Sequence, residues 1–131
     1  MKSGESFLKL YEIIATLRGP EGCAWDREQT PHSMRGHLLE ESYETIEAIE
    51  HDDSAAVREE LGDVYLLVTM LAYMYEERGE FSVSDCLGDI AEKLIRRHPH
   101  VFGASDASTS AEIVEQWERI KSEIEGKPEK T

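Results

Sequence analysis

Residues 59–71, EELGDVYLLVTML, have the hydrophobic spacing of a buried helix, yet two acidic side chains fall inside the apolar face. At about 100° per residue, the apolar positions on that face are Val57, Val64, Leu67 and Leu71. Glu60 and Asp63 lie within the same stripe rather than opposite it. Because an unpaired carboxylate removed from water costs several kcal/mol, these two acids require a compensating partner.

Helical signals dominate the rest of the chain, and strand signals are nearly absent. Five segments combine helical periodicity with a cap or a stop residue, and they cover about residues 3–17, 31–50, 54–78, 83–98 and 110–124. Short connections between them favour antiparallel neighbours. The sequence therefore predicts an all-α bundle of four to five helices.

Two of these segments have an apolar face at helical spacing, and we expect that of the fourth helix to pack at the core. In the second helix the face consists of Leu39, Tyr43, Ile46 and Ile49. In the fourth helix it consists of Leu87, Ile90 and Leu94.

The length of 131 residues predicts a single domain over 1–131, and residues 125–131 are expected to fray at its end. No segment has the apolar length of a membrane span, and the first residues, MKSGESFLKL, lack the apolar core of a signal peptide. Cys23 and Cys86 are far apart and form no CxxC pair. A cytoplasmic protein with no membrane association is the expectation.

The formal net charge of −14 argues against a nucleic-acid partner. Binding a phosphate backbone requires clustered Lys and Arg side chains that replace its counterions. A small phosphorylated ligand stays possible if cations are present locally, and solubility is the alternative explanation for the acidity.

Four acids on two neighbouring helices favour a metal site. Glu41 and Glu44 are three residues apart on the second helix, and Glu60 and Asp63 have the same spacing on the third. If the two helices pack antiparallel, the pairs can converge on a cation, and oxygen-only ligands suit Mg²⁺ or Mn²⁺. The alternative is a solvated helix face, which we expect for Glu40.

Cationic and aromatic residues near the C-terminus are candidates for phosphate and base contacts. Lys93 and Arg97 share one face of the fourth helix, and Lys121 follows Trp117 by one helical turn. Cations at a helix C-terminus and a tryptophan in the core are the alternatives. Trp25, in the loop after the first helix, either stacks on a base or closes a dimer interface.

Five blocks of the sequence, in order, resemble the MazG-type nucleoside triphosphate pyrophosphohydrolases over about residues 7–125. They are LRGPEGCAWDREQT, HLLEESYETIEAI, REELGDVYLLV, KLIRRHPHVFG and EIVEQWERIK. The acids of the family's EExxE…ExxD signature correspond to Glu40, Glu41, Glu44, Glu60 and Asp63. This chain has one such unit and is similar to the amino-terminal unit of relatives that carry two.

The resemblance implies an all-α NTP pyrophosphohydrolase fold completed by dimerisation, and Mg²⁺-dependent cleavage of an NTP or dNTP to the monophosphate and pyrophosphate. The implied metal ligands are Glu41, Glu44, Glu60 and Asp63, and the implied nucleotide contacts are Lys93, Arg97, Trp117 and Lys121. Glu40 or Glu59 would be an outer group or a base, and Glu60 would also belong to the catalytic set. A metal-bound water would attack the α-phosphorus. The competing hypothesis is a non-catalytic helical dimer with a degenerate cation site, which binds nucleotide or a protein partner.

Overall fold

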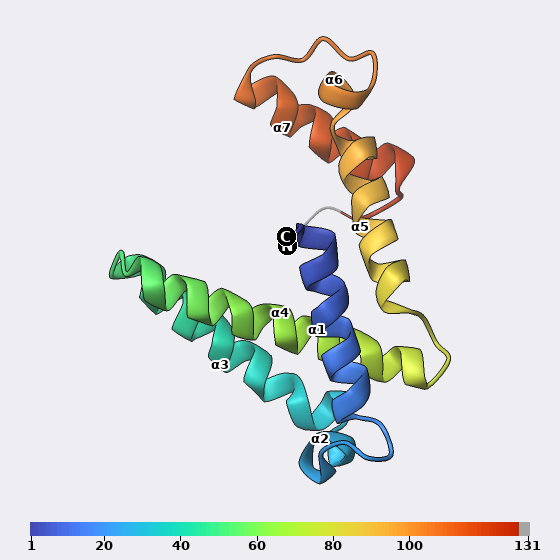
Figure 1. The fold of residues 1–131 in the computed structure, drawn as a ribbon. Helices are drawn as coiled ribbons and strands as arrows, with labels where there is room; N and C mark the ends of the chain where they lie inside the picture. The colour runs from blue at the N-terminus through green and yellow to red at the C-terminus, as the bar shows by residue number, and fades with distance from the viewer. Residues whose placement is uncertain (129–131) are drawn as a thin grey trace. The chain divides into compact units, whose positions relative to one another are not determined.

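A computed structural model describes residues 1–128, and every regular element in that part of the chain is helical. The elements, in order, are α1 (Ser3–Leu17), α2 (Ala24–Glu28), α3 (Pro31–Glu50), α4 (Ser54–Glu77), α5 (Val83–Arg97), α6 (Pro99–Phe102), α7 (Ser110–Arg119) and the π-helical turn η1 (Ile120–Ile124) (Figure 1). The predicted all-α class is confirmed. The short helices α2 and α6 lie outside the five helical segments that the sequence predicts. Among residues 1–128, no helix has the length and hydropathy needed to cross a bilayer.

The helix ends follow the capping residues of the sequence. Thr30 accepts a hydrogen bond from the backbone of Ser33, whose hydroxyl in turn accepts from the Thr30 backbone, and Pro31 begins α3. Asp53 caps α4 through the backbone N–H of Ala56, at 3.1 Å. These side chains satisfy backbone donors that the first helical turn leaves unpaired, so the predicted boundaries are confirmed.

Contacts between helices divide the chain into two compact units, residues 1–83 and the part from Ser84 onward. The sequence predicts one domain because no linker is evident. The division into two units falls at the start of α5, without a linker. The two units are described separately below.

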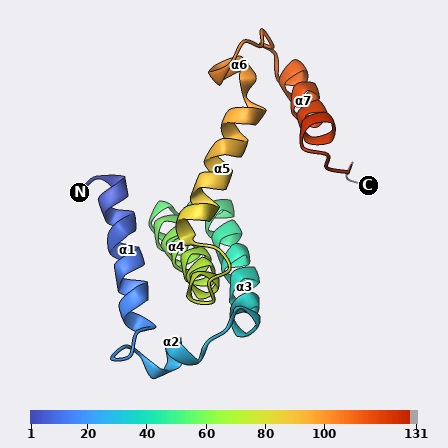
Figure 2. The same ribbon diagram turned by 90° about the vertical axis from the view of Figure 1, so that its right-hand side faces the viewer.

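The first unit is built on a helical hairpin. Helices α3 and α4 lie side by side along their length (Figure 1), and α1 packs against α4 (Figure 2). Buried residues from all three helices form the core: Ile14, Met34, Leu67, Met70 and Met74. At its edge the Tyr11 hydroxyl donates to Glu76, and this hydrogen bond raises the pKa of Tyr11 to about 12. The core therefore fixes the register of α4 against α1 and α3.

The apolar face of α3 is exposed in the single chain. Leu39, Tyr43, Ile46 and Ile49 each leave more than half of their surface accessible to solvent. The buried side of α3 instead includes Thr45 and Ala48. Small side chains allow two helices to approach closely, so α3 turns them toward α4 and its larger apolar residues outward. The spacing predicts this apolar face, and none of residues 1–128 covers most of it.

The second unit is held by ion pairs at its C-terminal end. Glu125, directly after η1, accepts hydrogen bonds from Arg96 and from Arg97. Its side chain is only 6% exposed. The expectation that the tail frays from residue 125 therefore does not hold for Glu125, and residues 129–131 lie outside the described part. The apolar residues of α5 expected to pack, Leu87, Ile90 and Leu94, are each more than 40% exposed.

Candidate metal centre

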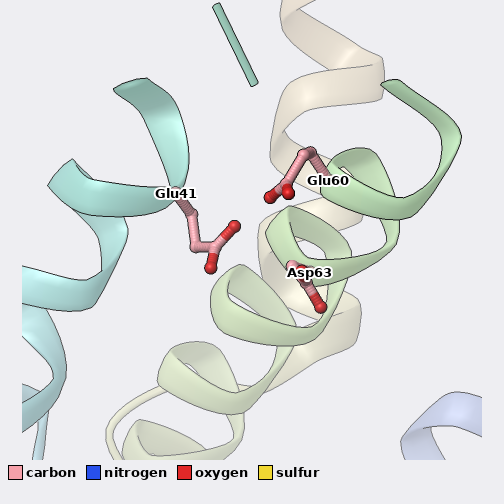
Figure 3. A group of neighbouring side chains, drawn as sticks. All are labelled: Glu41, Glu60 and Asp63. Atoms are coloured by element: carbon pink, nitrogen blue, oxygen red, sulfur yellow. The ribbon is translucent and has the colours of Figure 1, made fainter. Parts of the chain in front are cut away.

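Three carboxylates converge between α3 and α4. Glu41 extends from α3 toward Glu60 and Asp63 on α4 (Figure 3). One oxygen from each of them lies within 4.8 Å of the others. A single cation with oxygen ligands at about 2.1–2.6 Å can bridge such separations. We call Glu41, Glu60 and Asp63 the carboxylate cluster.

The hairpin itself produces this convergence. Only three residues, His51–Asp53, separate α3 from α4, and Asp52 reverses the chain with a positive φ of 50°. Glu60 and Asp63 are one turn apart on α4, and so both face α3. The antiparallel packing predicted from the short connection is thus what brings acids from two helices together.

The cluster contains carboxylate oxygens that nothing in the described chain compensates. Oε2 of Glu41 and Oε2 of Glu60 are buried and have no hydrogen-bond partner among residues 1–128. The close approach of the Glu41 carboxyl group, and then burial, raise the pKa of Glu60 above its ordinary value. Buried unpartnered carboxylates are unfavourable unless a cation or a proton neutralises them. The donor set is all oxygen and fits a hard divalent cation.

The other signature acids lie around the cluster. Glu44 is exposed and is not part of the three-oxygen group, although a hydrogen bond shared with Glu60 and the charge of Glu60 raise the pKa of Glu44. Glu40 is exposed and its Oε2 lies 3.7 Å from Nδ1 of His37. Glu59 is also exposed and outside the group. The structure thus brings together three of the four acids that the spacing predicts as ligands.

The predicted nucleotide contacts Lys93, Arg97, Trp117 and Lys121 all belong to the second unit. Arg97 is buried, and its guanidinium stacks over the Trp117 ring at 5.0 Å from the centroid. Nζ of Lys121 lies 3.8 Å from Oε2 of Glu118. In this conformation Arg97 and Trp117 contact each other and organise the end of α5 against α7.

A pocket of about 220 Å³ adjoins the carboxylate cluster, and both Glu41 and Asp63 line it. Its wall includes Trp25 and Asp26 from α2 and His37 from α3. Sequence patterns point to Trp25 but not to Asp26 or His37. The position of His37, one turn before Glu41 on the same helix face, was the available signal.

Comparisons with known proteins agree with this arrangement. The family model of the MazG nucleotide pyrophosphohydrolase domain matches residues 29–102, which include the whole cluster. The chain is 47% identical over 126 residues to the nucleoside triphosphate pyrophosphohydrolase/pyrophosphatase MazG of Thermotoga maritima, covering 96% of this chain and 48% of that protein. It is 45% identical over 116 residues to the nucleoside triphosphate pyrophosphohydrolase of Escherichia coli K12, covering 88% of this chain and 44% of that protein. The chain therefore spans about half the length of these curated relatives.

A solved structure supports the fold independently. The crystal structure of a mazG-related protein from Thermotoga maritima superposes with a TM-score of 0.73, covering 90% of this chain and 98% of that chain. At 24% sequence identity, this likeness concerns the fold alone. The family match over residues 29–102 shows that the chain belongs to the MazG nucleotide pyrophosphohydrolase domain family.

Proposed function

We propose that the chain is a divalent-metal-dependent nucleoside triphosphate pyrophosphohydrolase, which cleaves an NTP or dNTP to the monophosphate and pyrophosphate. The observation that carries the proposal is the carboxylate cluster with its buried, unpartnered oxygens on Glu41 and Glu60. A solvated acidic helix face would not bury such atoms. The family membership supports the reaction class.

Glu41, Glu60 and Asp63 would hold Mg²⁺, or Mn²⁺ in its place, and Glu44 would join from the next turn of α3. When bound, the ion would supply charge stabilisation for the triphosphate and a bound water of lowered pKa. The core holds α3 and α4 against each other, and so it keeps these ligands at a fixed separation. Glu40 and Glu59 are exposed and lie next to cluster residues in the sequence. We propose them as the outer groups that orient a water molecule or accept a proton from it.

Lys93, Arg97, Trp117 and Lys121 are the proposed nucleotide contacts. Arg97 donates to Glu125 in this structure, at 2.6 Å between Nη2 and Oε1. To contact a phosphate oxygen, the guanidinium would exchange this carboxylate for the phosphate, which has the same bidentate acceptor geometry.

We also propose that a second copy of the chain covers the exposed apolar face of α3. Leu39, Tyr43, Ile46 and Ile49 form a continuous stripe at helical spacing that the single chain leaves in water. Burial of four large apolar side chains favours association by about 1.5–3 kcal/mol for each fully buried one. A homodimer is the simplest closed assembly that meets this requirement.

Incubation with a panel of NTPs and dNTPs tests the activity, with pyrophosphate and monophosphate as the measured products. We expect both products with Mg²⁺ and neither after EDTA treatment. Nucleotide binding without pyrophosphate would instead support a non-catalytic binding module, and activity that survives EDTA would refute the metal requirement. The base and sugar that are turned over fastest follow from the same panel.

A further inference from the structure

Two chemically different kinds of residue line the pocket beside the carboxylate cluster. Glu41 and Asp63 line it and belong to the cluster as well. The apolar residues Met34, Leu66, Leu67 and Met70 also line it, and because three of them are buried core residues we call these four its base. A ligand that occupies the pocket therefore contacts apolar side chains and two acids of the proposed cation site.

The base of the pocket is suited to an aromatic ring and unsuited to a phosphate. Met34, Leu67 and Met70 are almost fully buried and belong to the core of the first unit. They carry no hydrogen-bond donor in their side chains, so a phosphate or a sugar hydroxyl placed there would lose its hydration without replacement. Methionine sulfur, in contrast, makes favourable contacts with aromatic rings.

Trp25 supplies a flat wall that stays open to solvent. Its side chain is 53% exposed although it lies beside a buried core. Helix α2 is held in place by Arg18, whose guanidinium donates to the backbone carbonyls of Asp26 and Gln29 and also to Glu77 on α4. Because Arg18 anchors α2 to the hairpin, the indole is presented in a fixed position and offers a stacking surface.

Polar groups line the same pocket. The Asp26 carboxylate accepts hydrogen bonds, and the His37 imidazole can donate or accept them. An apolar pocket with a few polar groups is typical of sites for small heterocyclic ligands. The volume of about 220 Å³ is below the range of about 300–1,000 Å³ that encloses whole drug-sized ligands, and so it suits one part of a nucleotide.

We propose that this pocket binds the heteroaromatic base of the nucleotide, stacked on Trp25, and that Asp26 and His37 contact the polar edge of the base. The proposal rests on the proposed function, because it places the triphosphate toward Glu41 and Asp63. It assigns base recognition to the first unit.

The test compares a nucleotide with a ligand that lacks the base. The α,β-imido analogue of ATP and imidotriphosphate are titrated calorimetrically, with Mg²⁺, into the wild type and the Trp25→Ala, Trp25→Phe and Glu28→Gln variants. Stacking on an aromatic side chain contributes enough affinity that Trp25→Ala should weaken the nucleotide analogue by about 10- to 100-fold. Imidotriphosphate should bind all four proteins equally. Trp25→Phe should recover most of the affinity, and Glu28→Gln, an exposed change on the same short helix, should leave it intact.

Four results would overturn the proposal. The first is that Trp25→Ala weakens the binding of both ligands equally, and the second is that it weakens the binding of neither. The third is that the wild type fails to bind the nucleotide analogue. The fourth is that the Trp25→Ala variant forms a smaller assembly in sedimentation, which would assign Trp25 to a subunit interface. In parallel, pyrophosphate release by the wild type is measured with ATP as the substrate. If no pyrophosphate appears while binding of the analogue depends on Trp25, the proposed activity fails and the base pocket stands.

Discussion

The guanidinium of Arg97 donates to both carboxylate oxygens of Glu125, from Nη2 to Oε1 at 2.6 Å and from Nε to Oε2 at 3.1 Å. Arg96 donates to the same carboxylate at 2.8 Å. A bidentate pair of this kind is both stronger and more directional than a single charged contact. It ties the C-terminal end of α5 to the residue that follows η1 and is the main polar link within the second unit.

The ion pair predicts a pH dependence of stability. The hydrogen bonds from Arg97 hold the pKa of Glu125 well below its ordinary value of 4.5. The unfolded chain therefore binds a proton at a higher pH than the folded chain, so this contribution is fully present above pH 4.5 and is lost as the pH falls toward the folded pKa. We expect the free energy of unfolding, measured by urea denaturation in EDTA, to decrease from about pH 5 to pH 2.

Glu125→Gln is the matched variant for that prediction, because the amide keeps the shape and does not titrate. It should be less stable than the wild type at neutral pH, and the difference should shrink as the pH falls. Parallel stability profiles of the two proteins would show that Glu125 does not contribute through its charge.

The carboxylate cluster predicts which acids activity requires. Glu60→Gln and Asp63→Asn should each reduce pyrophosphate release by about 100-fold or more, because a lost ligand removes several kcal/mol of charge stabilisation. Circular dichroism should show unchanged helix content. Glu50→Gln, an exposed change at the end of α3, is the control and should retain wild-type turnover. Near-normal turnover in both cluster variants would contradict the assignment of the site.

Metal binding and stability should be linked through the same side chains. With EDTA-treated protein, Mg²⁺ at 100 times its dissociation constant should stabilise the fold by about 2.7 kcal/mol. Glu60→Gln removes a buried unpartnered charge next to Glu41, so the metal-free variant should melt above the metal-free wild type. Its melting temperature should then respond little to Mg²⁺. Differential scanning calorimetry measures these melting temperatures. Equal shifts with Mg²⁺ in the variant and the wild type would remove Glu60 from the ligand set.

The exposed face of α3 predicts self-association. Tyr43→Arg places a charge in the middle of the apolar stripe, and it should convert the wild-type assembly to a monomer in light scattering coupled to size exclusion. Glu12→Arg, an exposed acidic position on α1, is the control for the added charge. A wild-type protein that is monomeric at high concentration would contradict the proposed dimer.

The core residue Ile14 should contribute more to stability than any exposed apolar residue of α1. Its side chain has 0% exposure and contacts α4 through the core of the first unit. Ile14→Ala should therefore lower the free energy of unfolding by about 2–5 kcal/mol, through lost burial and the remaining cavity. The comparison is Ile13→Ala. Because Ile13 is 47% exposed, this substitution should lower the free energy of unfolding much less. Chemical denaturation of both variants measures the difference.

The helices and most of their ends could be predicted because their signals are local. Thr30 with Pro31 begins α3, Asp53 begins α4, and Thr109 with Glu112 begins α7, as the sequence indicates. Each cap satisfies backbone groups within three or four residues, and so it needs no information about the rest of the fold. The same locality explains why Glu60 and Asp63 could be placed on one face of α4.

Contacts between distant segments could not be predicted, because they depend on how the helices pack. The sequence makes Arg97 a candidate phosphate ligand, and the fold adds that it pairs with Glu125, 28 residues away, and stacks over Trp117. The spacing places Leu39 and Tyr43 on one apolar face of α3, and close packing of Thr45 and Ala48 against α4 leaves that face exposed. Periodicity identifies a face of a helix but not its partner, because the partner depends on side-chain size and charge across the fold. Glu41 meets Glu60 and Asp63 for the same physical reason: the sequence determined their spacing, and the packing of α3 on α4 determined that they meet.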